Sequence, residues 1–259
     1  MASTYLDSIL QWHRKRAHED ARTFEDLRLA ALACAPARGF ASAISTTPHL
    51  AVIAELKRKS PSKGDLNIDL DPADIASMYQ QGGASCMSVL TDVNHFGGSV
   101  SDLQSARSAC SLPVIRKDFS VDARDVCDAR IMGADCVLLI AAALSDAELA
   151  SFLALSTEID IDALVEVHDE RELDRALSAG ATLVGVNQRD LVTFEVDQDR
   201  AVRVAAMMPK GIIKVAESGV RGRDDALALR QAGYDAVLVG EHLVTSSDPI
   251  RALTDLCVD

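Results

Sequence analysis

Short apolar runs rich in β-branched residues recur along the chain at intervals of roughly 20 to 30 residues, with helical patterns between them. This alternation indicates a parallel sheet covered by helices, and about eight strands favour a closed barrel over an open sheet. No GxGxxG or GxxxxGK[ST] motif follows the first run, so a nucleotide-binding open sheet has little support. The predicted strands are 51–56, 86–90, 112–116, 135–140, 162–167, 182–187, 212–216 and 235–239. The sequence therefore predicts an α/β fold with a single (β/α)₈ TIM barrel.

The segment before the first strand contains two predicted helices, at about 3–19 and 23–34, and then a link over 35–48. A chain of 259 residues with 48% hydrophobic content can bury the core of one such barrel. We expect residues 1–259 to form a single catalytic domain, with 1–48 as a helical extension packed on the barrel.

Composition excludes several classes of partner. The 26 Lys and Arg residues against 39 Asp and Glu residues give a net charge of −13, which argues against a nucleic-acid or anionic-membrane partner. The longest apolar stretch, 136–144, is too short to cross a bilayer as a helix, and charged residues at 13–16 interrupt the amino-terminal apolar pattern. We therefore expect a cytoplasmic protein. The cysteines lack CxxC spacing, which predicts reduced core thiols and no metal site: Cys34, Cys86, Cys110, Cys127, Cys136 and Cys257.

Polar side chains follow strand after strand at the end where barrel enzymes place their chemistry. Side chains alternate faces along a strand, so Ile53, Glu55 and Lys57 share one face, opposite Val52, Ala54 and Leu56. Any one such residue is more often an ion pair or a satisfied core group. A whole ring of buried charge is costly, however, so the set indicates a functional cavity. The other members of the predicted ring are Lys117, Glu166, Asn187, Glu217 and Ser218.

Glycine-containing loops follow the seventh and eighth predicted strands, at 217–220 and 239–242. Glycine lets backbone N–H groups approach an anion, and these two loops are the usual phosphate site of a barrel. Ser60 and Lys57 can reach the same place from the first loop. The sequence thus predicts a small anionic ligand that is held locally inside a negatively charged protein.

Seven motifs, in order over about residues 50 to 245, carry a specific resemblance. They are Ala54-Glu55-Leu56-Lys57-Arg58-Lys59-Ser60-Pro61-Ser62-Lys63-Gly64, Ser88-Val89-Leu90-Thr91-Asp92, Phe96-Gly97-Gly98-Ser99, Arg116-Lys117-Asp118-Phe119, Leu164-Val165-Glu166-Val167-His168, Val186-Asn187-Gln188-Arg189-Asp190-Leu191 and Ala216-Glu217-Ser218-Gly219. Together they resemble the indole-3-glycerol phosphate synthases. The amino-terminal extension is also similar in kind to that family's extra helices. His242 departs from the pattern, because the family commonly has a small residue there.

The resemblance implies a lyase of tryptophan biosynthesis, a carboxy-lyase without cofactor or metal. Its small phosphorylated substrate, 1-(2-carboxyphenylamino)-1-deoxyribulose 5-phosphate, would be converted to indole-3-glycerol phosphate, carbon dioxide and water. A monomer is the expected state. Lys117 would protonate the sugar carbonyl during ring closure, with a pKa lowered towards neutrality by burial and by the nearby Lys57.

The remaining roles also come from the resemblance. Glu166 and Glu55 would stabilise the iminium charge and handle protons in the dehydration, and Lys57 would protonate the leaving hydroxyl and meet the phosphate. How these groups divide the acid and base roles stays open. Asn187 and Glu217 would orient hydroxyls, and Arg189 would hold the carboxylate side. The other substrate-binding residues would be Ser60, Ser218, Gly219, Gly240 and Glu241 near the phosphate and Phe96, Phe119 and Leu138 around the aromatic ring.

Two other function classes fit the pattern less well. A barrel isomerase such as phosphoribosylanthranilate isomerase would use an Asp and Cys pair at strand ends, whereas this chain has Glu55 and Lys57 at the early position. A non-catalytic sugar-phosphate-binding module would need the phosphate loops but not the ring of Lys and Glu. At the departure from the family pattern, we expect His242 to be a bystander, the Glu241 side chain to point away, and the phosphate to rest mainly on backbone N–H groups.

Overall fold

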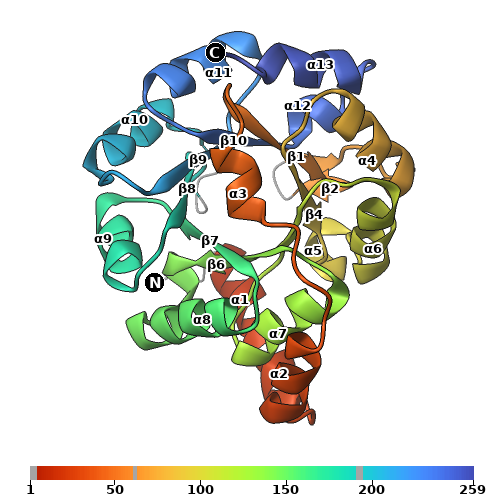
Figure 1. The fold of residues 1–259 in the computed structure, drawn as a ribbon, viewed down its shortest axis with the longest axis vertical. Coiled ribbons are helices and arrows are strands. Elements are labelled where there is room, and N and C mark those ends of the chain that lie inside the picture. Colours follow the sequence, from red (N-terminus) through yellow and green to blue (C-terminus); the bar gives the residue numbers. More distant parts are fainter. Residues whose placement is uncertain (1–4, 61–62, 191–194) are drawn as a thin grey trace.

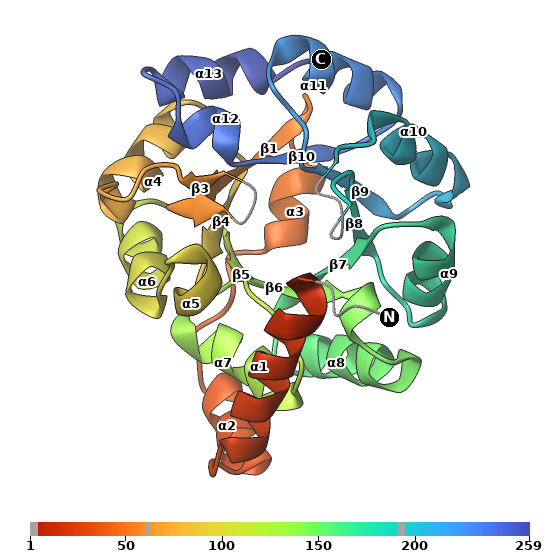
Figure 2. The same ribbon diagram turned by 180° about the vertical axis from the view of Figure 1, so that it is seen from behind.

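The computed structural model describes residues 5–60, 63–190 and 195–259. In this part of the chain, eight parallel strands close into a barrel in the order β1-β10-β9-β8-β7-β6-β5-β4 (Figures 1 and 2). Their bounds are β1 (Ala51–Leu56), β4 (Cys86–Leu90), β5 (Val114–Lys117), β6 (Cys136–Ile140), β7 (Asp162–Val167), β8 (Leu183–Asn187), β9 (Ile213–Glu217) and β10 (Ala236–Val239). Each agrees with its predicted range to within two residues, so the predicted (β/α)₈ barrel is confirmed.

Helices surround the barrel and follow the strands in turn. The longer ones are α4 (Pro72–Gln81), α6 (Val100–Ala109), α7 (Ala123–Met132), α8 (Asp146–Glu158), α9 (Glu170–Ser178), α10 (Gln198–Met207), α11 (Arg223–Gln231) and α13 (Pro249–Leu256). Shorter elements lie at the carboxyl ends of strands, namely β2 (Lys59–Ser60), β3 (Gly64–Asp65), α5 (Val93–Phe96), the 3₁₀ turn Ala141–Ala143 and α12 (Glu241–Val244). Local chemistry fixes several boundaries. Ser145 and Glu148 form a capping box at the start of α8, and Gly133 ends α7 with a left-handed φ of 97°.

The alternation of side chains along β1 separates two cores, as predicted. Val52, Ala54 and Leu56 pack with the surrounding helices, whereas Ile53 belongs to the core inside the barrel. Beyond Ile53 the inward-facing side chain is Glu55, which is buried. The interior is therefore apolar in its lower part and becomes charged towards the carboxyl ends of the strands. All six cysteines are free thiols, as the sequence predicted.

The amino-terminal extension comprises α1 (Tyr5–Glu19), α2 (Phe24–Leu32) and α3 (Phe40–Ser45). The first two match the predicted helices, although residues 3 and 4 of the predicted range lie outside the described residues. The predicted link over 35–48 was wrong in part, because it contains α3. Phe40 and Ile44, one turn apart on α3, are fully buried in the inner core, so α3 closes the amino-terminal end of the barrel. Burial of this apolar pair explains why six residues form a helix here.

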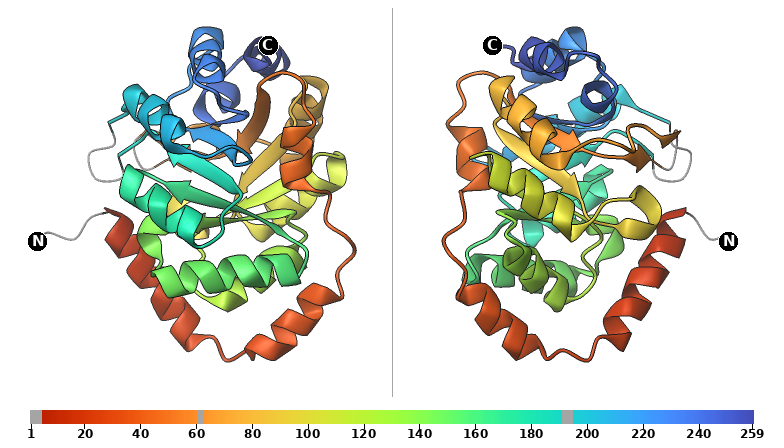
Figure 3. Two further views of the ribbon diagram at one scale, coloured as in Figure 1. Left: turned by 60° about the vertical axis from the view of Figure 1, so that its left-hand side comes forward. Right: turned by 90° about the vertical axis from the view of Figure 1, so that its right-hand side faces the viewer.

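The extension runs along the outside of the barrel from one end to the other (Figure 3). The Arg124 side chain on α7 donates to the carbonyl oxygens of Ala17 and Asp20, at 2.6 and 2.7 Å. Arg22 forms a bidentate pair with Asp128, with both N–O distances below 3 Å. These contacts fix α1 and α2 against α7, while α3 lies across the opposite end of the barrel from α1 (Figures 1 and 2).

None of the helices in the described ranges combines the length and the apolar character needed to span a bilayer.

The closure of the amino-terminal end of the barrel by α3 can be tested by creating a cavity there. Phe40→Ala should lower the free energy of unfolding by about 3–5 kcal/mol, because it removes a fully buried aromatic side chain. Phe24→Ala is the matched control, since Phe24 lies on α2 and is 41% exposed. We expect that control to stay within about 0.5 kcal/mol of the parent in urea unfolding. Equal losses for the two variants would mean that α3 does not seal the core.

Candidate active site

A cavity of about 950 Å³ opens at the carboxyl ends of the strands, a size suited to a small metabolite. Each strand of the barrel ends at this mouth, so side chains far apart in sequence meet there. The fifteen residues that the sequence singled out all line it: Glu55, Lys57, Ser60, Phe96, Lys117, Phe119, Leu138, Glu166, Asn187, Arg189, Glu217, Ser218, Gly219, Gly240 and Glu241. The motif residues Pro61, Ser62 and Leu191 lie outside the described residues.

Two lysine–glutamate groups form the charged centre of the cavity. Lys117 Nζ, at the end of β5, lies 2.7 Å from Glu166 Oε2 and 3.0 Å from Glu217 Oε2. Lys57 Nζ lies 2.6 Å from Glu55 Oε1. Both glutamates around Lys117 have side chains no more than 3% exposed. The cavity thus holds two ammonium groups and three carboxyl groups away from bulk water, where each interaction is stronger than at the surface.

The pKa of Lys117 corrects the sequence-based expectation. Burial by itself would lower the pKa of this ammonium, but the carboxylates of Glu166, Glu217 and Glu55 outweigh burial and raise it above its ordinary value. The expected repulsion by Lys57 does not dominate, because Lys57 is paired with Glu55. Lys117 therefore rests as a charged ammonium at neutral pH rather than as an amine close to titration.

The two carboxylates beside Lys117 have opposite shifts. Burial raises the pKa of Glu217 to about 7, and the neighbouring Glu166 adds to that effect against the attraction of Lys117. Burial acts on Glu166 too, but Lys117 and His168 overcome it and hold the pKa of Glu166 well below its usual range. One member of the pair is thus ionised, while the other exchanges a proton near neutrality, as in other paired carboxylates.

His168 is a residue near the charged centre that the sequence reasoning did not single out. Its Nε2 lies 3.4 Å from Glu166 Oε1 and its Nδ1 lies 3.0 Å from Glu172 Oε2. Burial would lower the pKa of His168, but these two carboxylates raise it to about 10. The signal was present in the motif, since a residue two positions after Glu166 on a strand points to the same face.

Apolar groups form one wall of the cavity. The rings of Phe96 and Phe119 lie 6.2 Å apart between centroids, and Leu138 is buried beside them in the inner core. Helix α1 adds Tyr5, Leu6 and Ile9 to the lining, which the sequence reasoning missed. The spacing of Leu6 and Ile9 along a predicted helix marks one face, and this was the available signal.

The opposite end of the cavity carries the glycine loops. Ser218 and Gly219 have left-handed φ angles of 68° and 76°, so the chain turns sharply after β9. Such a conformation is strained for serine and is typical of functional loops. At Gly240, a Cβ atom would lie only 2.4 Å from Glu55 Oε1, so this glycine makes room for Glu55. Glu241 forms an ion pair with Lys63.

Within the described residues, one group of side chains has metal-ligand chemistry. His13, Asp92 and His95 place one ligand atom each within 4.8 Å of the others, close to Phe119 at the edge of the cavity.

Solved structures of other barrels resemble this one in fold. N-acetylmannosamine-6-phosphate 2-epimerase from Clostridium perfringens matches with a TM-score of 0.60 at 13% identity, over 77% of this chain and 89% of that one. Thiamine phosphate pyrophosphorylase from Pyrococcus furiosus matches with a TM-score of 0.59 at 16% identity, over 81% of this chain and 94% of that one. At these identities the likeness concerns the fold alone.

Sequence comparison gives the family. The family model described as indole-3-glycerol phosphate synthase matches residues 6–256. An indole-3-glycerol phosphate synthase of Mycobacteroides abscessus is 50% identical over 257 residues, covering 98% of this chain and 94% of the relative. Indole-3-glycerol phosphate synthase 2 of Streptomyces coelicolor is 51% identical over 249 residues, covering 96% and 95%. The chain therefore belongs to the indole-3-glycerol phosphate synthase family, decarboxylating carbon–carbon lyases of tryptophan biosynthesis.

Proposed function

We propose that this cavity closes, decarboxylates and dehydrates 1-(2-carboxyphenylamino)-1-deoxyribulose 5-phosphate to give indole-3-glycerol phosphate. The observation that carries the proposal is the Lys117 ammonium between Glu166 and Glu217, with the Lys57–Glu55 pair in the same cavity. Such a set provides two ammonium donors and three carboxyl groups where an acyclic ketone must gain a proton and later lose water.

The domain organisation, the location and the oligomeric state of the chain are also part of this proposal. Residues 1–259 would act as one catalytic domain, which the contacts of α1 and α2 with α7 support. A cytoplasmic location and a monomeric state are further parts of the proposal. The net charge of −13 favours a small substrate over a nucleic acid.

The substrate's phosphate would lie at the end of the cavity formed by the loops after β9 and β10. Ser60, Ser218 and the backbone at Gly219 and Gly240 all line that end. Lys57, which directly follows β1, supplies positive charge to the same cavity. Backbone N–H groups and hydroxyls can donate hydrogen bonds to the oxygens of such a phosphate.

The anthranilate ring would lie against the apolar wall. Phe96, Phe119 and Leu138 offer flat and aliphatic surfaces for an aromatic ring. Arg189 also lines the cavity and would hold the carboxylate of that ring. This orientation directs the carboxylate-bearing carbon of the ring towards the sugar carbonyl.

In the first step, the ring carbon that bears the carboxylate forms a bond to the carbonyl carbon. Lys117 gives its proton to the carbonyl oxygen, which becomes a hydroxyl. Its raised pKa does not prevent this transfer, since the alkoxide being formed is a stronger base than the amine. The resulting iminium charge is stabilised by the ionised Glu166, and loss of carbon dioxide returns the bonding electrons to the ring.

In the last step, the hydroxyl leaves as water and a proton leaves the adjacent carbon. Lys57 would protonate the hydroxyl and Glu55 would accept the carbon-bound proton, because these two groups are already paired at 2.6 Å. Asn187 donates to Glu166 Oε1 at 3.2 Å, so it can fix that carboxylate while it orients a sugar hydroxyl together with Glu217.

Removal of the proposed acid should abolish most of the chemistry. Lys117→Met should lower kcat for the carboxyphenylamino deoxyribulose phosphate by roughly 10² to 10⁴, as is typical when a general acid is lost. Turnover is followed by indole fluorescence, and circular dichroism checks the fold. Lys210→Met is the control, since Lys210 is exposed away from the cavity. Turnover like that of the unmodified chain in Lys117→Met would reject this role.

The same assay separates an enzyme from a binding module. Glu166→Gln should retain affinity for indole-3-glycerol phosphate but slow turnover, because it removes a charge needed in the transition state and keeps the shape of the side chain. A protein that binds the product but has no measurable turnover to lose would support the module.

His168 gives a pH-dependent prediction. Its pKa is raised to about 10 in the folded chain against roughly 6.5 when unfolded. The stability that it contributes is therefore fully present below about pH 6.5 and is lost as pH rises through about 10. His168→Gln should be less stable than the parent by roughly 1–3 kcal/mol near pH 6, with a smaller difference near pH 10. Urea unfolding at several pH values measures this, with the exposed His18→Gln as control. A constant difference would contradict an imidazolium here.

A further inference from the structure

We propose that His13, Asp92 and His95 form a hydrogen-bonded clasp that positions α1 as a wall of the substrate cavity. The proposal rests on the function proposed above, because it concerns how that cavity holds its aromatic substrate. All three are positioning residues, since their contacts join them to one another and to the cavity wall.

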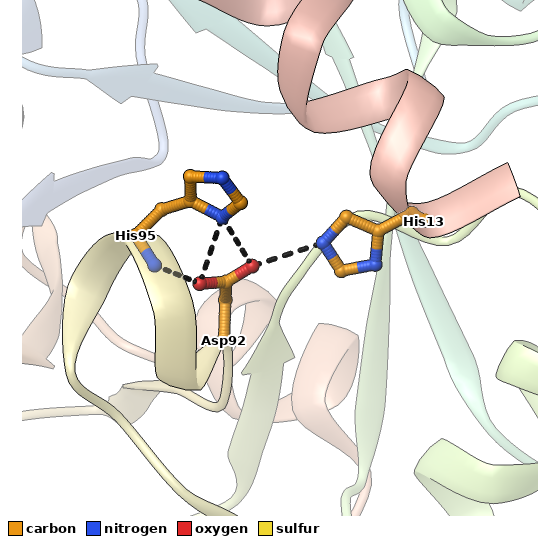
Figure 4. Close-up of side chains that lie close together, drawn as sticks. All are labelled: His13, Asp92 and His95. Carbon is orange, nitrogen blue, oxygen red and sulfur yellow. Dashed lines mark hydrogen bonds and ion pairs between the residues drawn. The ribbon is translucent and has the colours of Figure 1, made fainter. Parts of the chain in front are cut away.

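Asp92 is the acceptor at the centre of the clasp (Figure 4). It follows β4, and its side chain is 1% exposed. His13 Nε2, from α1, lies 2.9 Å from Asp92 Oδ2. His95 Nδ1, from α5, lies 3.1 and 2.9 Å from the two carboxylate oxygens, and the His95 backbone N–H also donates to Oδ1. One buried carboxylate therefore joins two histidines that are 82 positions apart in the chain.

The charges around this centre favour a fixed acceptor. Burial would raise the pKa of Asp92, but the hydrogen bonds from His13 and His95 outweigh burial and lower it far below its usual value. A second carboxylate, Asp118, lies 3.8 Å from His13 Nε2, and Arg116 neutralises it at 2.9 Å. Asp92 thus stays ionised throughout the working pH range.

The second nitrogen of His13 indicates how the ring takes part. Its Nδ1 is buried and has no hydrogen-bond partner among the described residues. A proton on Nδ1 would have no acceptor, so the arrangement fits a ring that carries its proton on Nε2 and donates it to Asp92. Such hydrogen bonds to an ionised acceptor are stronger than neutral ones.

The clasp acts on the cavity through its neighbours along the chain. Ile9 and Leu6 lie one and two turns before His13 on the same face of α1, and both line the cavity. The His13 ring also lies 5.3 Å from the ring of Phe119, and Phe96 directly follows His95. Fixing the two histidines therefore sets the positions of α1, α5 and the aromatic wall together.

This predicts a specific kinetic signature. If α1 is in place for only a fraction of the time, the apparent affinity for substrate falls by that fraction, whereas the chemistry at Lys117 is unchanged once substrate is bound. Loss of a purely structural contact would instead lower stability without raising KM.

The experiment compares His13→Phe, which retains a ring but loses the donor, with His18→Phe on the exposed side of the same helix. In buffer containing EDTA, His13→Phe should raise KM for the carboxyphenylamino deoxyribulose phosphate roughly tenfold and change kcat less. The control should leave both values as in the parent. Unchanged KM in an active His13→Phe variant overturns the clasp, whereas an inactive parent overturns the proposed function instead.

A second variant keeps the test valid if His13→Phe does not fold. His95→Phe leaves the sequence of α1 unchanged and should raise KM in the same way. Trp12 is the only tryptophan in the chain, and its ring lies 4.8 Å from that of His13, so its fluorescence reports on α1. In His95→Phe, acrylamide should quench Trp12 more strongly than in the parent. Unchanged quenching together with unchanged KM contradicts the clasp.

The same three residues could instead hold a metal, because two histidines and a carboxylate are a known ligand set for transition metals. In the clasp, His13 Nε2 and His95 Nδ1 already lie at hydrogen-bond distance from the Asp92 carboxylate. KM of the parent should therefore be the same with EDTA and with added Zn²⁺. A KM that changes between these conditions would make the group a metal site and overturn the clasp.

Discussion

The buried Lys117 ammonium between two carboxylates is the interaction on which the rest of the site depends. Removing these charges from water is costly, and their mutual attraction compensates only when the geometry is tight. The distances of 2.7 and 3.0 Å meet this condition, and they need β5, β7 and β9 to end at the same height. The closed barrel provides that alignment. Burial beside Glu166 also raises the pKa of Glu217 to about 7. The site therefore carries one ionised carboxylate, Glu166, and one carboxyl group that gains or loses a proton near neutral pH.

The two ends of the barrel have different tasks. At the amino-terminal end, Phe40 and Ile44 of α3 complete the apolar core inside the barrel. At the carboxyl end, α1 reaches over the mouth and supplies apolar groups to one side of the cavity. The extension is therefore part of both the stability and the binding surface of the barrel, and its two roles are separated along the chain.

The sequence predicted much of this because its signals were local. Strand ends, two-residue alternation and glycine loops placed Glu55, Lys117 and Gly240 at one mouth without knowledge of any contact. The pKa of Lys117 was predicted in the wrong direction, because its sign depends on carboxylates 49 and 100 positions later, at distances that a sequence does not contain. The link at 35–48 was likewise assigned without its helix, since six residues form one only through tertiary burial.

Contacts between distant elements were beyond prediction for the same reason. His13 is an ordinary histidine in a helical pattern until Asp92 is brought to its ring nitrogen. His168 lay within a motif, yet its second partner, Glu172, comes from the first turn of the following helix. Gly240 was assigned to the phosphate, whereas the structure shows that its missing side chain also accommodates Glu55.

Titration of the glutamate carboxyl carbons by ¹³C NMR tests the charged centre most directly. Glu166→Gln and Glu217→Gln variants would assign the two resonances. We expect Glu217 to titrate at about pH 7, while Glu166 remains ionised to pH values well below its ordinary pKa range. If both carboxylates instead titrate near the unperturbed value of about 4.3, the ammonium does not lie between two buried carboxylates.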